Sequence, residues 1–259
     1  MRKVLVLLYG MFAYVGFLAA CLYLAGFLMN LLVPKSVDSP VTAAFWTGLW
    51  VNVSLVVLFG VQHSLMARPT FKKWWTRFVP SEIERSSYVM ASNVVFALLF
   101  WLWQPSGGMI WDVQQPLGQA ILYALFAAGW LIVLVTTFLI DHFDLFGLRQ
   151  VWLYFRGQPC TRSKFVTPGP YKYVRHPLYV GWLMVFWATP TMTVGHLVLA
   201  AGVTVYVLIA IQMEERNLVQ FHGDAYQSYR QRVPMLLPRW KRKSLSADTA
   251  GSATTESVS

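Results

Sequence analysis

The sequence predicts an all-α polytopic integral membrane protein with about six transmembrane helices, the last two forming a helical hairpin, and a cytoplasmic helix near the C-terminus. Apolar residues make up 56% of the 259 positions and charged residues only 12%, a balance that neither soluble domains nor disordered chains show. Several apolar runs reach the roughly 20 residues that a membrane-spanning helix needs. The basic residues are spread over the loops between these runs. The formal charge of +10 therefore indicates membrane topology and not nucleic-acid binding.

Four apolar runs in the first half of the chain predict membrane-spanning helices. They cover about residues 4–33, 41–66, 86–103 and 117–140. The first run is longer than the apolar core of a signal peptide and ends without a small-residue cleavage site. We therefore interpret it as a spanning helix like the other three.

The distribution of Lys and Arg assigns the loops to the two sides of the membrane. The N-terminus, the C-terminus and residues 67–85 and 141–176 are basic, whereas residues 34–40 and 104–116 hold one Lys between them. Basic loops stay in the cytoplasm. We therefore expect both termini on the cytoplasmic side.

The next apolar segment, from Pro177 to about Ala188, predicts a helix that is too short to cross a bilayer. At 1.5 Å per residue it extends roughly 18 Å, whereas the hydrocarbon core is about 30 Å thick. Thr189 and Pro190 end it. The simplest solution is a helical hairpin that turns within residues 189–195 and returns along about 196–213. Its turn should be buried against other helices and not in lipid.

This hairpin predicts that two distant polar motifs meet. Pro177 suits the first position of a helix, which places Arg175 and His176 beside the unpaired N–H groups of the helix start, a ready anion site. Glu214 and Glu215 end the returning helix. Because carboxylates oppose the dipole at a helix C-terminus, we expect the helix to continue past them, the carboxylates to face a cation, or both. Taken alone, the first motif also fits a membrane-interface belt.

A short surface helix is predicted after these carboxylates. Tyr226 lies three residues before Tyr229 and four before Arg230, so the three side chains share one helical face. This helix could close over the site.

These motifs resemble the membrane methyltransferases of the isoprenylcysteine carboxyl methyltransferase superfamily. The resemblance rests on Gly169-Pro-Tyr-x-Tyr-x-Arg-His-Pro-x-Tyr-x-Gly181, Glu214-Glu215-x-x-Leu218 and Gly223-x-x-Tyr226-x-x-Tyr229. The runs from His142 to Trp152 and from Phe186 to His196 are more narrowly similar to the bacterial methanethiol S-methyltransferases. His222 departs from the Phe that the superfamily often has before this Gly.

The resemblance implies an enzyme that binds S-adenosyl-L-methionine and methylates a small thiol, most simply methanethiol to dimethyl sulfide, in the bacterial inner membrane. We expect Arg175 or His176 with the helix-start N–H groups to bind the cofactor's carboxylate, and Glu214 or Glu215 to bind its ribose or ammonium. Tyrosine faces would meet the adenine or the sulfonium. The cofactor-binding residues carried over from the two motifs are Tyr173, Arg175, His176, Pro177, Tyr179, Glu214, Glu215, Tyr226 and Tyr229.

The thiol has to lose its proton, because the thiolate is the nucleophile. The sequence offers His63, His142 and Asp144 as candidates. Each has a structural alternative: a helix–helix hydrogen bond for His63, an interfacial cap for His142, and an ion pair with Arg149 or Arg156 for Asp144. His196 is expected in the hairpin turn, on the far side of the membrane.

We predict three parts of the chain: residues 1–116 as acceptor-side transmembrane helices, 117–240 as the methyltransferase core, and 241–259 as a disordered tail. Two alternatives stay open for the function. The same cofactor chemistry could act on a lipid or a prenyl-cysteine carboxylate, or the chain could be a non-enzymatic membrane protein of the NnrU type. Membrane lipids and the thiol are the expected partners, with no nucleic acid and no obligate protein partner. The two cysteines have no disulfide or zinc spacing, and no metal site is expected.

Overall fold

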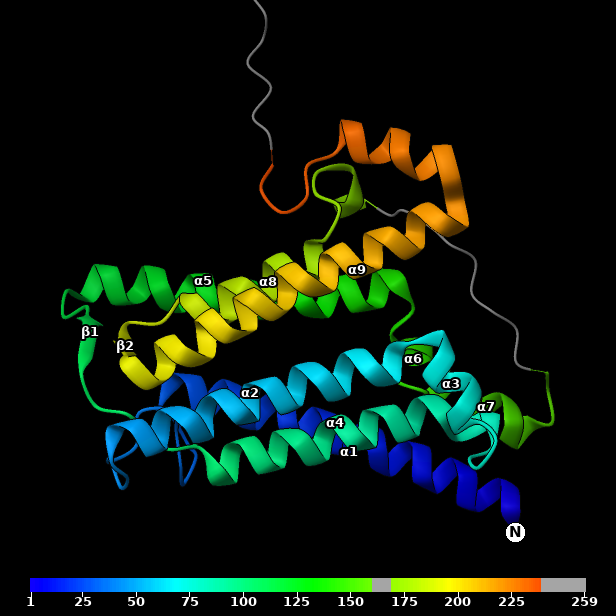
Figure 1. Cartoon of the computed structure of the whole chain (residues 1–259), viewed down its shortest axis with the longest axis horizontal. Helices are drawn as coiled ribbons and strands as arrows, with labels where there is room; N and C mark the ends of the chain where they lie inside the picture. The colour runs from blue at the N-terminus through cyan, green and yellow to red at the C-terminus, as the bar shows by residue number, and fades with distance from the viewer. Residues whose placement is uncertain (160–168, 239–259) are drawn as a thin grey trace, which may run out of the picture.

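The computed structural model describes residues 1–159 and 169–238 and is almost entirely helical (Figure 1). The predicted tail at 241–259 lies outside the described residues. In chain order the elements are α1 (Arg2–Met29), α2 (Phe45–Ala67), α3 (Pro69–Trp75), η1 (Ser81–Ile83), α4 (Glu84–Leu102), β1 (Met109–Asp112), α5 (Pro116–Ile140), α6 (His142–Leu145), α7 (Leu148–Arg156), η2 (Gly169–Lys172), α8 (Pro177–Trp187), β2 (Thr191–Thr193) and α9 (Val194–Arg232).

Five of the described helical stretches are long and apolar enough to cross a membrane. They are α1, α2, Ser81–Leu102, α5 and the Val194–Phe221 part of α9. Their outward faces are apolar, as the exposed side chains of Leu22, Trp101 and Leu117 illustrate, and lipid tolerates such faces where water would not. These observations confirm the predicted all-α polytopic membrane fold.

The spanning helices form two groups that α2 joins. Helices α1, α2 and α4 lie together in one group, and α5, α8 and α9 lie together in the other (Figure 1). Helix α2 packs against both α4 and α9. The buried core accordingly runs from Phe27 and Trp103 in the first group to Val185 and Ile211 in the second.

The predicted hairpin is present as α8 and α9. Helix α8 ends at Trp187 and α9 begins at Val194, so the chain reverses within the expected residues. Thr189 and Met192 in the turn are buried, which confirms that the turn is covered by protein. The sequence reading missed one feature here: β2 in the turn pairs antiparallel with β1.

Helix α8 packs closely against α5 through two glycines. A Cβ added at Gly181 would lie 2.9 Å from the carbonyl oxygen of Gly129, and the reverse distance is also 2.9 Å. Small residues of this kind let two membrane helices bring their backbones together. This contact holds α8 directly against α5.

Helix α9 continues past Glu214 and Glu215, which the position of these carboxylates led us to expect. It runs to Arg232 and bends at Gly223, where φ is 52° and ψ is −130°, a conformation that only glycine adopts without strain. The arm after the bend folds back toward η2 (Figure 1). There the hydroxyl of Tyr229 donates a hydrogen bond of 2.6 Å to the carbonyl oxygen of Tyr171.

Candidate active site

The candidate site is built on the start of α8. Pro177 is the first residue of this helix and His176 is its N-cap, as the sequence predicts. The backbone N–H of Arg175 donates to the carbonyl of Pro234 at 2.9 Å, and that of His176 donates to Met235 at 3.2 Å. The chain that follows α9 therefore lies along the entry to α8.

The side chains of the two motifs meet at this place. Arg175 Nε donates to Glu215 Oε1 at 2.7 Å, and His176 Nε2 lies 3.1 Å from the same oxygen. All three residues are buried. Chain reversal in the hairpin thus brings the helix start and the paired glutamates together, as expected. We call Arg175, His176, Glu214 and Glu215 the charged corner.

Glu215 is held by protein groups on both of its oxygens. Arg230 Nε lies 3.2 Å from Oε2, while Arg175 occupies Oε1. Arg175 also donates to the carbonyl oxygens of Arg230 and Val233. Both Arg175 and His176 contact Glu215, and the bent arm of α9 supplies carbonyl acceptors to Arg175 that the sequence motif did not reveal. Binding of a cofactor carboxylate by Arg175 or His176 stays a prediction.

Glu214 is the accessible carboxylate of the charged corner. Its side chain is 48% exposed, compared with 7% for that of Glu215. Tyr179 donates from its hydroxyl to Glu214 Oε2 at 3.3 Å, and His176 Nδ1 lies 3.8 Å from the same oxygen. Of the two glutamates, Glu214 is therefore the one that can contact a ligand.

The tyrosines of the two motifs differ in their surroundings. Tyr226 is buried and its ring centroid lies 5.8 Å from that of Tyr229, whereas Tyr173 is exposed. Burial raises the pKa of Tyr226 to about 12 and also raises the pKa of Tyr171. These phenols stay neutral at physiological pH. Tyr226 acts in the packing of the arm, and Tyr173 and Tyr179 present the accessible rings.

His63 lies on α2, the helix that packs against both α4 and α9. Its Nδ1 lies 3.4 Å from the hydroxyl of Ser92 on α4, a helix–helix hydrogen bond of the kind given as its structural alternative. Its ring centroid lies 4.9 Å from that of Tyr88 and 6.2 Å from that of Tyr206 on α9. The sequence analysis did not single out Tyr88, Ser92 or Tyr206. The sequence signal that could have identified two of them is the four-residue spacing of Tyr88 and Ser92, which places both side chains on one face of α4.

His142 is enclosed at a different place. Tyr14 Oη lies 2.8 Å from its Nε2 and Thr137 Oγ1 lies 2.9 Å from its Nδ1, and the ring of Phe138 stacks on it at 4.3 Å. Burial lowers the pKa of His142. Both ring nitrogens thus join α1 and α5 to α6, a structural role in helix packing that differs from the interfacial cap considered for this residue.

Asp144 and His196 also have structural partners. Asp144 pairs with Arg149 at 3.0 Å. His196 is buried at the start of α9, where its Nε2 lies 3.2 Å from the carbonyl oxygen of Phe186. Within residues 1–159 and 169–238, no hydrogen bond, ion pair or ring contact links His142 or Asp144 to the charged corner.

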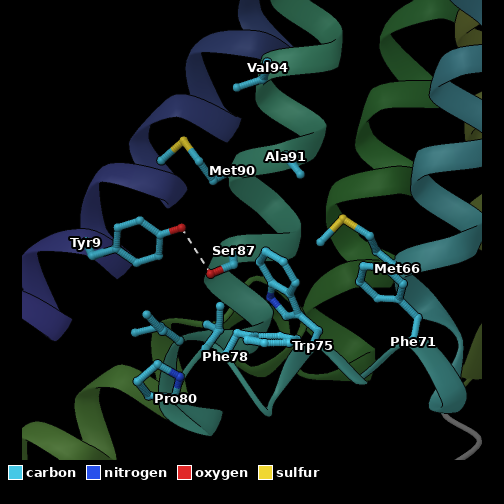
Figure 2. Close-up of a pocket in the computed structure, with 12 residues that line it drawn as sticks. Tyr9, Met66, Phe71, Trp75, Phe78, Pro80, Ser87, Met90, Ala91 and Val94 are labelled. Atoms are coloured by element: carbon cyan, nitrogen blue, oxygen red, sulfur yellow. Dashed lines mark hydrogen bonds between the residues drawn. The ribbon is translucent and has the colours of Figure 1, made fainter. Parts of the chain in front are cut away.

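A separate apolar pocket of about 680 Å³ lies between α1, α3 and α4 (Figure 2). The hydroxyl of Tyr9 donates to Ser87 Oγ at 3.1 Å inside it. Ala91 and Val94 of α4 line it as well.

Comparison with known proteins supplies the remaining observations. The phospholipid methyltransferase family matches residues 123–225, a range that contains the whole charged corner. A methanethiol S-methyltransferase of Crocosphaera subtropica is 54% identical over 94% of this chain and 96% of its own length. One from Mycobacterium tuberculosis is 49% identical over 92% and 98%. Nurim of Sus scrofa is 29% identical over 64% and 66%. No solved structure matches the chain.

Proposed function

The chain belongs to the methanethiol S-methyltransferase family, and from this premise we propose that it transfers a methyl group from S-adenosylmethionine to methanethiol, giving dimethyl sulfide. The observation that carries the proposal is the convergence of Arg175 and His176 with Glu214 and Glu215 at one end of the α8–α9 hairpin. We further propose that this end faces the cytoplasm, where the methyl donor is available, because the neighbouring loops are basic.

The charged corner fits the donor through its one accessible carboxylate. Tyr179 occupies a single oxygen of Glu214, and the side chain is half exposed. The other oxygen is free to accept hydrogen bonds from a ribose or to pair with an ammonium group. The exposed ring of Tyr173 and the ring of Tyr179 offer faces for an adenine or a sulfonium. When bound, S-adenosylmethionine supplies an electrophilic methyl group on a positively charged sulfur.

Arg175 and Glu215 act in this proposal as positioning residues. Their buried ion pair joins the start of α8 to α9, and two further bonds of Arg175 attach the arm that carries Tyr226 and Tyr229. A corner fixed in this way holds Glu214 and Tyr179 in one arrangement before a ligand arrives. Such preorganisation is how a protein aligns two reactants for direct displacement.

We assign the removal of the thiol proton to His63, in preference to His142 and Asp144. Ser92 Oγ lies 3.1 Å from the carbonyl oxygen of Tyr88 and 3.3 Å from Oε1 of Gln62. Both of these oxygens can only accept, so the Ser92 hydroxyl donates to one of them. The Ser92 oxygen is then the acceptor for a hydrogen on His63 Nδ1. The lone pair is left on Nε2, which is the atom that can take a proton from a thiol.

Purified protein in detergent micelles tests the proposal. With S-adenosylmethionine and methanethiol, headspace gas chromatography should detect dimethyl sulfide from the parent chain. Glu214→Gln should lose S-adenosylmethionine affinity and turnover together. Glu82→Gln, the same change on η1, is the matched control and should keep both.

His63→Gln separates the base from the binding site. This variant should bind S-adenosylmethionine like the parent and lose turnover at neutral pH. Turnover should return as the pH rises toward the pKa of the thiol, because the nucleophile then forms without a base. A Glu214→Gln variant with parental affinity and turnover would contradict the assignment of the site. Methylation of co-purified lipid in place of methanethiol would favour the lipid acceptor.

A further inference from the structure

We propose that methanethiol binds in a crevice between α2, α4 and α9, and that Tyr206 sets the size of thiol that the crevice accepts. We define the aromatic crevice as His63, Tyr88 and Tyr206, with Phe59 and Phe96 beneath them. The inference rests on the proposed methyl transfer and names the acceptor site within it.

The rings of the aromatic crevice stand close together but are not sealed. The centroid of His63 lies 4.9 Å from that of Tyr88, and that of Tyr206 lies 6.2 Å from His63 and 5.6 Å from Phe59. These residues are all half-buried, whereas core rings such as that of Trp103 have no exposed surface. The rings are thus not enclosed by protein on every side, as a binding site for an acceptor requires.

Aromatic packing closes the recess on the side of the main core. The ring centroid of Phe59 lies 4.9 Å from that of Phe96. The ring centroid of Phe96 lies 5.8 Å from that of the buried Phe100. On the wall, a Cβ added at Gly60 would lie 3.1 Å from the ring of Tyr206, so the ring rests directly against α2. In the proposal, this packing leaves room for a small acceptor between the rings and none for a long chain.

The crevice adjoins the charged corner through Tyr179. The hydroxyl of Tyr179 donates to Glu214, and Tyr179 and Tyr206 both pack against the same buried core. Tyr206 precedes Glu214 by two turns of α9, about 12 Å along the helix. A thiol in the crevice is therefore adjacent to the accessible carboxylate at which we propose the methyl donor is held.

The chemistry of the crevice suits a small alkyl thiol. Sulfur makes favourable contacts with aromatic rings, and the methyl group needs only apolar surroundings. The thiol proton passes to His63 Nε2 and the sulfur forms a bond to the methyl carbon of the donor. The bond between that carbon and the donor sulfonium breaks, and its electron pair stays with the donor sulfur. The products are dimethyl sulfide, the demethylated donor with a neutral sulfur, and a protonated His63.

The pocket in Figure 2 is the competing location for the thiol. Its volume of about 680 Å³ far exceeds what a molecule with one carbon and one sulfur fills. No His, Asp, Glu or Lys is among the residues that line it, and its Tyr9 hydroxyl is paired with Ser87. That pocket offers nothing to take the thiol proton, so the observations favour the aromatic crevice.

A change of acceptor preference tests the inference in purified full-length protein. Tyr206→Leu should raise the ratio of kcat/KM for ethanethiol to that for methanethiol at least about tenfold, since one methylene in an apolar pocket is worth about that factor or more. Tyr88→Leu, on the opposite wall, should shift the ratio in the same direction. S-adenosylmethionine affinity, measured separately, should stay at the parental value in both.

Two controls complete the design. Tyr123→Leu makes the same change on the exposed face of α5, and Ala91→Phe fills the pocket of Figure 2; both should keep the parental ratio. An unchanged ratio in active Tyr206→Leu and Tyr88→Leu proteins would overturn the inference, as would a shift produced by Ala91→Phe instead. Failure of the proposed function is distinguishable, because the parent itself would then transfer no methyl group.

Discussion

Breaking the buried ion pair between Arg175 and Glu215 gives the most quantitative prediction. Arg175→Met removes a guanidinium that donates to Glu215 and to the carbonyls of Arg230 and Val233. The methionine keeps much of the side-chain volume, so loss of charge and hydrogen bonds dominates the effect. Glu215 then stays buried with His176 and Arg230 as its remaining partners.

The size of the effect follows from the burial of both groups. The two side chains are only 8% and 7% exposed, and removal of one partner from a buried pair costs about 3–5 kcal/mol. Replacing both partners by apolar residues of similar volume is far less costly, because no unpaired charge is left. The double variant Arg175→Met/Glu215→Leu should therefore be more stable than Arg175→Met alone.

Thermal unfolding in detergent, followed by the fluorescence of the 12 tryptophans, measures these differences. We expect Tm to fall by on the order of 10 °C in Arg175→Met and to recover by several degrees in the double variant. Losses that simply add in the double variant would refute the reasoning, since additivity is the behaviour of groups that do not interact.

Three further predictions concern other parts of the fold. Burial lowers the pKa of His142, so the unfolded chain binds more protons in acid than the folded protein does. The contribution of His142 to the free energy of unfolding should be full above a pH of about 6.5 and should be lost as the pH falls below it. Tm measured from pH 7.5 to 5.5 should therefore drop less in His142→Gln than in the parent. Gly181→Val would place a Cβ 2.9 Å from the Gly129 carbonyl oxygen and should separate α8 from α5, lowering both Tm and turnover; parental values for both would contradict the close helix contact. Gly223→Ala should strain the bend by about 1–3 kcal/mol and make the arm after it more sensitive to limited proteolysis, and a parental digestion pattern would count against the bend.

The α8–α9 hairpin and the approach of Glu215 to Arg175 were predictable, because both follow from the length of the apolar segment that begins at Pro177. Residues 177–188 are too few to cross a bilayer, so the chain has to reverse, and the reversal carries Glu215 to the level of Arg175. The carbonyl partners of Arg175 were not predictable in the same way. They depend on the bend at Gly223, which returns the carbonyls of Arg230 and Val233 to the start of α8, and a single glycine in the sequence does not specify such an angle.

The aromatic crevice was beyond sequence reasoning for a different reason. Aromatic residues make up 16% of the chain, and in a membrane protein most of them pack in the core or at the interface. Tyr88 and Tyr206 become distinct only when α4 and α9 pack on α2 and bring both rings to His63. The β1–β2 pairing was missed for a similar reason, because two short segments far apart in sequence gave no strand signal.

Transfer of an isotopically labelled methyl group tests the central claim most directly. Purified parent protein would be given methanethiol and S-adenosylmethionine that carries a deuterated methyl group, and the headspace would be analysed by mass spectrometry. We predict dimethyl sulfide with one deuterated methyl group from the parent and a greatly reduced yield from Glu214→Gln. Folded parent protein that binds the labelled donor and yields no labelled dimethyl sulfide would contradict the account.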